Sequence, residues 1–390
     1  MKLIENLKDE FIYIFNKNPI RGYFSPGRVN LIGEHTDYNG GNVFPCAISM
    51  GTYGLISKRN DSKIRIFSKN FSEVGVIEFD LNHIIYDLKD HWGNYLKGVI
   101  KTFQSHGFNI STGLDILIYG DIPNSSGLSS SASLEVLMAV ILKDTFTFKL
   151  DMISLAKLCQ EAENKFMGVN CGIMDQFAVA MGKENCAILL DCNNLKYSYS
   201  NINLKGYKII IGSTNKKRGL ADSKYNERRS QCEEALKILQ KYKPISNLGE
   251  LTENDFETFK NHIRNPIIRK RAKHAIYENI RTLKAVSALK ENNLSYLGSL
   301  LNESHISLRD DYEVTGIELD TLVEAAWDQK EIVLGSRMTG AGFGGCTVSI
   351  VEEDSIHEFI DHCTKKYADI MGYSPNFYTV NISDGARNLF

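Results

Sequence analysis

Four side chains suited to binding a polyhydroxylated ligand lie close together in residues 27–45, which read GRVNLIGEHTDYNGGNVFP. They are Arg28, Glu34, His35 and Asp37. Carboxylates and an imidazole suit sugar hydroxyls, because each hydroxyl both donates and accepts hydrogen bonds. A solvated turn, in which Asp and Asn serve turn geometry, is the alternative for an isolated Glu-His-Thr-Asp. The composition of the whole segment favours a binding site.

Apolar residues at the start of the same segment predict the element that supports it. Val29, Leu31 and Ile32 predict a buried strand, and Gly33 ends it. Charged side chains directly after a buried strand have a rigid support, which is a usual way to build a site. We therefore expect the polar group to lie at the end of this strand.

A second segment, PNSSGLSSSASLEV at residues 123–136, has the composition of an anion-binding loop. Ser129, Ser130 and Ser131 fall at the start of a predicted helix, where free backbone N–H groups and the helix dipole favour an anion. Gly127 allows a phosphate to approach the backbone closely, and a serine hydroxyl can bind magnesium. Helix capping alone explains one serine, but three in succession indicate more. No GxxxxGKS or GxxxxGKT occurs in the chain, so this is not a Walker-type loop.

A third segment, MTGAGFGGCTVSIV at residues 338–351, formally satisfies the pattern GxGxxG. Its three glycine positions are Gly340, Gly342 and Gly345. A dinucleotide-binding fingerprint must open a helix, whereas the apolar run after these glycines predicts a strand. We therefore reject the dinucleotide interpretation. We expect a loop that closes over a flat or anionic ligand, in the manner of a backbone anion nest.

A weaker signal lies in EAENKFMGVNCGIMDQFA, residues 161–178. Glu163 falls on a predicted helix, and Asp175 follows the sequence Gly-Ile-Met, so a carboxylate lies among apolar neighbours. Such surroundings are typical of a catalytic acid or base. The alternative is that Asp175 caps a helix or interacts with its dipole. This segment by itself leaves both interpretations open.

Hydrophobic periodicity predicts the elements that must position these side chains. Leu3, Leu7, Phe11 and Ile14 recur at helical spacing and predict an amphipathic N-terminal helix. Alternating strands and helices indicate an α/β or α+β architecture. The polar stretch 191–205 is the expected domain boundary. Strands are predicted at 114–119, 207–211, 346–351 and 377–382, and helices at 128–142, 151–166, 222–242 and 267–290.

Length and composition limit the class of protein. A chain of 390 residues exceeds one ordinary hydrophobic core and predicts two domains. A net charge of -2 argues against nucleic acid or an anionic membrane as a partner. Acidic residues interrupt the N-terminal segment and no apolar run is long enough to span a membrane, so we expect neither a signal peptide nor a membrane helix. Eight scattered cysteines without a CxxC pair predict reduced thiols and a cytoplasmic protein, and the histidines show no zinc-binding pattern.

Taken together and in this order, these segments resemble the galactokinases of the GHMP small-molecule kinase superfamily. The resemblance runs from FSPGRVNLIGEHTDYNGG through GLSSSASLEV, NCGIMDQF and MTGAGFGG to the terminal SDGAR, and so covers nearly the whole chain. It implies an α+β, two-domain GHMP kinase fold. Residues 1–200 would form an N-terminal mixed-sheet domain that binds the sugar and the ATP phosphates. Residues 201–390 would form a ferredoxin-like C-terminal domain, with the active site in the cleft between the two.

The resemblance also implies an activity, the transfer of the γ-phosphoryl group of ATP to the anomeric hydroxyl of galactose, with ATP and Mg²⁺ as cofactors. Arg28 and Asp175 would form the catalytic pair, in which Asp175 accepts the hydroxyl proton and Arg28 stabilises charge on the transferring group. Ser131 and Glu163 would bind Mg²⁺. The implied sugar contacts are Glu34, His35, Asp37, Gly172 and Tyr225. The implied triphosphate loop comprises Gly127, Leu128, Ser129, Ser130, Ser131 and Ala132.

Three alternatives are open. A kinase for a related sugar, such as N-acetylgalactosamine, would share Glu34, His35 and Asp37 and differ in the room near the sugar 2-position. A sugar sensor without catalysis would carry changes in the serine loop or at Arg28 and Asp175, and these are intact here. An α/β protein with turn-rich loops would not combine three such segments. The oligomeric state is left open by the sequence.

Overall fold

The structure is a computed structural model that describes residues 2–123, 127–216 and 221–390. Its α-helices are α1 (Lys2–Phe15), α2 (Gly93–Ser105), α3 (Ser130–Thr145), α4 (Met152–Ala162), α5 (Met174–Met181), α6 (Ala221–Leu239), α7 (Glu253–Phe259), α8 (Pro266–Lys290), α9 (Leu294–Ser307), α10 (Ile317–Trp327) and α11 (Ile356–Met371). Its strands are β1 (Arg21–Asn30), β2 (Asn42–Val43), β3 (Pro45–Lys58), β4 (Lys63–Ser68), β5 (Ile77–Asp80), β6 (Leu114–Gly120), β7 (Cys186–Asp191), β8 (Tyr197–Asn201), β9 (Tyr207–Ser213), β10 (Val333–Thr339), β11 (Cys346–Glu352), β12 (Asn376–Val380) and β13 (Arg387–Asn388).

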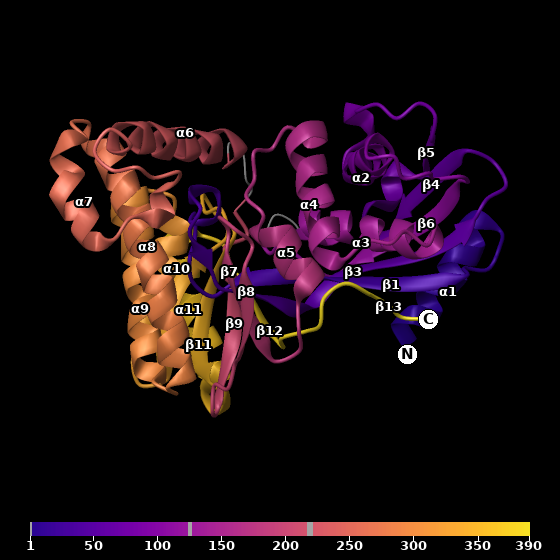
Figure 1. The fold of residues 1–390 in the computed structure, drawn as a ribbon. Helices are drawn as coiled ribbons and strands as arrows, with labels where there is room; N and C mark the ends of the chain where they lie inside the picture. The colour runs from indigo at the N-terminus through magenta and orange to yellow at the C-terminus, as the bar shows by residue number, and fades with distance from the viewer. Residues whose placement is uncertain (1, 124–126, 217–220) are drawn as a thin grey trace.

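The first sheet has the strand order β13-β1-β3-β6-β4-β5, and it is mixed because β4 pairs with β6 in parallel. Helices α2 to α5 cover one face, and α1 lies on the other (Figure 1). Successive side chains of a strand point to opposite faces. Ile116 of β6 therefore joins the core beneath α2 to α5, whereas Leu117 joins the cluster of Leu7 and Phe11 from α1. Burial of both faces explains the nearly continuous apolar sequence of this strand.

The second sheet is antiparallel throughout, with the order β10-β11-β9-β12. Numbered along the chain, its strands have the order 2-3-1-4, which is the ferredoxin-like arrangement. Helices α6 to α10 lie between the first and second of these strands, and α11 lies between the third and fourth. The predicted α+β fold, with an N-terminal mixed sheet and a ferredoxin-like C-terminal part, is confirmed.

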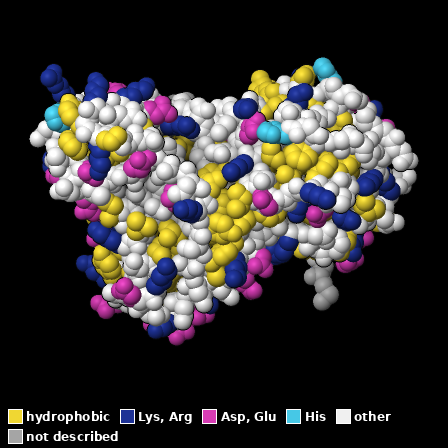
Figure 2. All heavy atoms as spheres, viewed as in Figure 1, with side chains coloured by type: hydrophobic (Ala, Val, Ile, Leu, Met, Phe, Trp, Pro, Cys, Tyr) yellow, Lys and Arg dark blue, Asp and Glu magenta, His cyan; other side chains and the backbone are white. Residues whose placement is uncertain are grey.

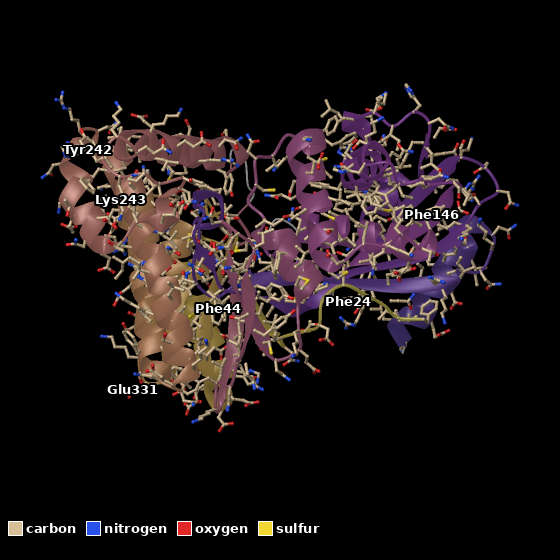
Figure 3. All side chains as sticks on the ribbon, viewed as in Figure 1. Phe24, Phe44, Phe146, Tyr242, Lys243 and Glu331 are labelled. Carbon is tan, nitrogen blue, oxygen red and sulfur yellow. The ribbon has the colours of Figure 1, made fainter. Side chains whose placement is uncertain are left out.

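A buried cluster joins the end of β1 to the second sheet. It contains Val29 and Ile32 from the first half of the chain together with Ile211 and Val348 from β9 and β11. Phe44, between β2 and β3, is fully buried in the same cluster and lies over the strands of the second sheet in the view of Figure 3. The polar residues that follow β1 are thus held where the two halves meet.

The polar stretch 191–205, which was expected to hold the domain boundary, is partly strand. β8 lies within it and pairs with β7 in a third sheet, β2-β7-β8. Polar and aromatic residues in YSYSN alternate across a half-exposed strand, and the loop-like composition concealed this pairing. The division at residue 200 stays a prediction.

The C-terminal strand β13 pairs with β1, so both termini lie beside the first sheet (Figure 1).

The predicted elements are confirmed with shifts at their ends. The helix expected at 128–142 begins at Ser130, and the one expected at 151–166 is α-helical only to Ala162 and continues as a π-helical turn, Glu163–Met167. Over the described residues, the structure has no helix that combines the length and the apolar character needed to cross a membrane. Acidic and basic side chains are interspersed over the face shown in Figure 2.

Candidate active site

A cavity of about 160 Å³ lies at the junction of the two halves. It collects residues that are far apart in the sequence: the segment after β1, the starts of α3 and α5, the π-helical turn, α6, and the loop between β10 and β11. All the predicted catalytic, sugar-binding and metal-binding residues line it. The lining comprises Arg28, Glu34, His35, Asp37, Ser131, Glu163, Val169, Cys171, Gly172, Met174, Asp175, Tyr225, Gly340 and Ala341.

Arg28 and Asp175 form a two-point ion pair at the wall of this cavity. Nε of Arg28 donates to Oδ1 of Asp175 at 2.8 Å, and Nη2 donates to Oδ2 at 2.8 Å. The Arg28 side chain is 4% exposed and the Asp175 side chain 30% exposed. The guanidinium is therefore fixed, while the carboxylate still faces the cavity. A planar donor fork gives this pair a defined orientation that a single point charge would not give.

The serine loop is fastened to the same pair. Nη1 of Arg28 donates to the carbonyl oxygen of Gly127 at 2.6 Å, and the Arg28 N–H donates to that of Leu128 at 3.1 Å. Ser129 adopts a left-handed conformation, with φ 61°, and its hydroxyl donates to Oδ2 of Asp175 at 2.5 Å. Because Ser129 makes no side-chain cap to α3, the capping interpretation does not hold for this serine. Residues 124–126 of the predicted loop lie outside the described residues.

The start of α3 has the features of an anion site. Ser130 is exposed, Ser131 is half-buried and Ala132 is fully buried, so the serines form the accessible side of the first turn. Backbone N–H groups in the first turn of a helix have no partner within the helix. With the helix dipole they attract negative charge.

Glu34 has a structural task besides lining the cavity. Its Oε1 accepts from the backbone N–H of Gly340 at 2.6 Å, and its Oε2 accepts from Nη2 of Arg337 at 2.8 Å and from Nδ2 of Asn30 at 2.6 Å. Burial raises the pKa of Glu34, and the charges of Arg337 and Arg28 oppose that rise. Glu34 thus ties the end of β1 to the end of β10.

Arg337 is a site residue that the sequence interpretation missed. It is fully buried, and its Nη1 donates to the carbonyl oxygens of Asn30 at 2.9 Å and Leu31 at 3.1 Å. A single charged side chain in the strand sequence VLGSRMT was the available signal, since a buried arginine needs a partner.

His35 is held as a neutral imidazole. Burial, with the neighbouring His274, lowers the pKa of His35 to about 3. Its Nδ1 shares a hydrogen bond of 2.7 Å with the Tyr38 hydroxyl, which in turn lies 2.8 Å from the Tyr312 hydroxyl. The ring of Tyr225, from α6, lies 5.6 Å from the His35 ring. The residues predicted to contact sugar on both halves of the chain therefore meet here.

Asp37 and Gly172 are in close contact. A Cβ at Gly172 would lie 1.9 Å from Oδ2 of Asp37, so any side chain at this position would displace the carboxylate. Burial, with the charge of Asp175, raises the pKa of Asp37 to about 6. The structure thus gives Gly172 a steric role in addition to its predicted role as a sugar contact.

Glu163 lies on the π-helical turn, next to the serine loop. Its Oε2 accepts from Nε2 of Gln176 at 2.6 Å and from Sγ of Cys171 at 3.2 Å. Burial raises the pKa of Glu163 to about 7, although the hydrogen bonds from Cys171, Gln176 and Ser131 oppose this. Ser131 and Glu163, which are distant in sequence, are therefore neighbours.

The glycine-rich loop connects two strands, β10 and β11, which confirms the rejection of a dinucleotide-binding fingerprint. Gly340 has φ +84°, and a Cβ there would lie 2.8 Å from the carbonyl oxygen of Gly127. The absence of a side chain thus allows this loop to contact the serine loop. The backbone N–H of Gly340 already donates to Glu34. The anion nest expected at the glycine-rich loop stays a prediction.

A second cavity, of about 180 Å³, adjoins the serine loop. It shares Ser130 and Ser131 with the loop and is otherwise mainly apolar and aromatic. The indole Nε1–H of Trp92 is buried there without a hydrogen-bond partner in the described structure. The sequence interpretation did not find this cavity, because its walls come from separate segments. The lining comprises Thr52, Ser68, Asn70, Phe71, Trp92, Tyr95, Ile118, Gly120, Ile122, Ser130, Ser131 and Leu134.

Fold and site together define a small-molecule kinase of the GHMP class. Three family models match the chain: the galactokinase galactose-binding signature at residues 9–58, the GHMP kinases N terminal domain at 94–183 and the GHMP kinases C terminal at 285–369. A mevalonate kinase of Methanococcus jannaschii shares the fold at 20% identity and a TM-score of 0.64, over 93% of this chain and 98% of that one.

Galactokinases that match nearly the whole chain have a higher sequence identity to it. Galactokinases of Clostridium beijerinckii and Bacillus subtilis are 63% and 52% identical, over 100% and 99% of each chain. The crystal structure of Lactococcus lactis galactokinase complexed with galactose is similar at 47% identity and a TM-score of 0.97, over 99% of this chain and 100% of that one. This chain belongs to the galactokinase family. The predicted family is thereby confirmed, and so is the predicted enzyme class, an ATP-dependent sugar kinase.

Proposed function

We propose that this protein acts in the cytoplasm and transfers the γ-phosphoryl group of ATP to the anomeric hydroxyl of galactose, giving galactose 1-phosphate and ADP. The observation that carries the proposal is the Arg28–Asp175 pair, which faces a cavity lined by hydroxyl-binding side chains and is hydrogen-bonded to the serine loop. A sensor without catalysis would not need this pair. All eight cysteines are free thiols, as is typical of cytoplasmic proteins.

Asp175 is the group that would accept the proton of the sugar hydroxyl. Its Oδ2 accepts from Arg28 and from Ser129, and its Oδ1 accepts from Nε of Arg28 and lies 2.7 Å from Nη2. The carboxylate is 30% exposed and lines the cavity. The proton moves from the hydroxyl to Asp175 as the sugar oxygen bonds to the γ-phosphorus and the bond to ADP breaks. Arg28 holds the carboxylate in place and contributes positive charge beside the transferring group. Such positioning and charge neutralisation account for most of phosphoryl-transfer catalysis.

This function is tested by product analysis. The purified protein, incubated with galactose and MgATP, is expected to release ADP and galactose 1-phosphate in equal amounts. Phosphorus NMR identifies phosphate attached to the anomeric carbon. N-acetylgalactosamine serves as the comparison substrate. Efficient transfer to N-acetylgalactosamine, with none to galactose, would replace this proposal by the related sugar kinase.

The second cavity is our candidate for the adenine base of ATP. It adjoins the serine loop, so a nucleotide in it could extend its phosphates along the first turn of α3 toward the Arg28–Asp175 pair. An aromatic ring can stack on the adenine base, and the indole N–H of Trp92 is a donor without a partner in the described structure.

Trp92→Ala is expected to raise the KM for ATP about 5- to 150-fold, because stacking of one base on an aromatic ring is worth about 1–3 kcal/mol. The KM for galactose should change little. Trp327→Phe is the matched control, since Trp327 lines neither cavity and bonds Asn302. Steady-state kinetics with each substrate varied in turn gives the answer. An equal rise in both KM values would assign Trp92 to general stability of the domain.

Ser131 and Glu163 fit a magnesium site that is completed by phosphates. Among the described residues, no group of three or more His, Cys, Asp or Glu side chains could hold a metal on its own. Magnesium commonly takes one or two protein oxygens and fills its remaining positions with water and substrate phosphates. A serine hydroxyl and a carboxylate beside the phosphate loop meet that description. When bound, the ion neutralises charge on the β- and γ-phosphates.

Ser131→Ala and Glu163→Gln are expected to raise the magnesium concentration needed for half-maximal rate by at least about tenfold. The KM for galactose should rise far less, because neither side chain is assigned to the sugar. Titration of magnesium at fixed galactose, and the reverse, measures both requirements. Equal shifts in the two, or none for magnesium, would reassign these residues to structural roles.

A further inference from the structure

Two fully buried polar side chains behind the cavity have no part in the mechanism above. Glu135 lies on α3, one turn beyond the serine loop, and Gln176 follows Asp175 on α5. Nε2 of Gln176 donates to Oε2 of Glu135 at 3.0 Å and to Oε2 of Glu163 at 2.6 Å. One amide group therefore connects two carboxyl groups away from solvent.

Two side-chain oxygens, one of Glu135 and one of Gln176, are unsatisfied. Oε1 of Glu135 and Oε1 of Gln176 are both buried and have no hydrogen-bond partner among the described residues. Both atoms are acceptors if Glu135 is ionised, and an unpaired buried polar atom is costly. A proton on Oε1 of Glu135 makes it a donor for Oε1 of Gln176. Nε2 of Gln176 already donates to Oε2 of Glu135. This one proton would therefore complete a cyclic acid–amide pair held by two hydrogen bonds.

The surroundings of Glu135 favour that proton. Burial raises the pKa of Glu135 well above its ordinary value, and the charges of Glu163 and Asp175 raise it further. Two further titratable neighbours, Cys159 and Cys171, are thiols whose own pKa values are raised by burial and by the charges of Glu135 and Glu163. The opposing influence is the Gln176 amide hydrogen bond. A neutral carboxylic acid is the form that this environment accommodates.

The amide also fixes one oxygen of Glu163. Oε2 of Glu163 accepts from both Gln176 and Cys171, so its lone pairs are occupied. Oε1 is then the oxygen left for the cavity and for the side of Ser131. Second-layer hydrogen bonds of this kind orient metal ligands and tune their affinity.

We propose that Glu135, as a neutral acid, and Gln176 form a positioning pair that orients the Glu163 carboxylate toward the metal and phosphate end of the site. The metal part of this inference rests on the proposed function, in which Glu163 binds magnesium. The proton on Glu135 does not depend on it.

Metal affinity tests the positioning role without relying on turnover. Mn²⁺ binding to the enzyme–ADP complex is measured by electron paramagnetic resonance, next to the magnesium requirement for activity. Gln176→Leu and Glu135→Leu are each expected to weaken metal binding about 10- to 100-fold, the usual range for second-layer partners. Glu135→Gln should recover most of that loss, because an amide at this position can donate to Oε1 and accept from Nε2 of Gln176. Gln104→Leu is the control, since Gln104 bonds the Leu81 carbonyl and lines neither cavity.

The protonation state is read separately by infrared difference spectroscopy. Wild type should show the carbonyl band of a protonated carboxylic acid, and Glu135→Gln should lack it. Persistence of all such bands in that variant would overturn the neutral acid.

Combining Gln176→Leu with Glu163→Gln separates failure of this inference from failure of the proposed function. If Gln176 acts through Glu163, the double variant binds metal no worse than Glu163→Gln alone. A strong effect of Glu163→Gln with none of Gln176→Leu or Glu135→Leu would overturn the positioning pair. No effect of Glu163→Gln itself would refute the metal assignment instead.

Discussion

Asp175→Asn should lower kcat by about a hundred- to ten-thousand-fold, the usual cost of losing a general base. An amide keeps the size of the carboxylate but neither accepts the sugar proton nor pairs with two donor groups of Arg28. Galactose affinity should change little, because the other side chains that we assign to the sugar hydroxyls are unaltered. Rapid-quench kinetics of a single turnover measures the chemical step, and equilibrium dialysis measures galactose binding.

Arg28→Lys is the companion variant, and we expect a loss of comparable size. Lysine carries the charge but cannot replace a planar fork that contacts Asp175 and the Gly127 carbonyl together. Arg59→Lys controls for the loss of an arginine elsewhere, since Arg59, which follows β3, pairs with Asp61 and with Asp115 of β6 and lines neither cavity. Turnover by Asp175→Asn close to that of wild type would remove Asp175 from the role of base. A mild effect of Arg28→Lys alone would restrict Arg28 to ordering the serine loop.

Glucose should be a poorer substrate than galactose by about ten-thousand-fold or more in kcat/KM. The two sugars differ only in the direction of the 4-hydroxyl. We assign Asp37 to neighbouring ring hydroxyls, and an equatorial 4-hydroxyl would leave this partly buried carboxylate without a partner. A site built to hydrogen-bond a hydroxyl rejects an analogue that lacks it by about that factor, because its own polar groups then go unpaired. Competition between the two sugars at fixed ATP measures the ratio. 2-Deoxygalactose should still be phosphorylated if few groups contact the 2-position.

The role of Asp37 can be read from its pH dependence. With its pKa raised to about 6 by burial and by Asp175, Asp37 is an ionised acceptor above that pH and a protonated group below it. The KM for galactose should therefore rise as pH falls through about 6, and Asp37→Asn should have a weaker affinity that no longer changes over this interval. Asp37→Ala should weaken galactose binding far more than ATP binding. Comparable wild-type rates on glucose and galactose would refute the assignment of Asp37.

Much of the site was predictable because its parts are local in sequence. Residues 27–45 place Arg28 within a strand and the sugar-binding candidates just after it, and residues 127–132 place small residues at a helix start. Backbone preferences of neighbouring residues determine such arrangements: β1 ends at Asn30, Gly33 permits the turn that follows, and serines accumulate where a helix begins. The strand after the glycine-rich loop was likewise evident from its apolar run, and it excluded a dinucleotide fold.

Other parts were decided by packing between segments far apart in the chain. Arg337 reaches Glu34 across 303 positions, and the second cavity draws its walls from β3, β4, β6, α2 and α3. The steric need for Gly172 appears only once Asp37 lies against it. Strand β8 formed in a stretch of linker-like composition because β7 offered an edge to pair with.

The sequence by itself therefore determined which chemical groups are available and the local backbone that presents each of them. The tertiary structure decided which groups are buried together, and burial is what changes their chemistry. The pKa of His35 is lowered to about 3, that of Asp37 is raised to about 6 and that of Glu135 is raised well above its ordinary value, because each group has lost water and gained particular neighbours. Desolvation and charge interactions depend on distances through space, and periodicity and spacing along the chain do not encode those distances.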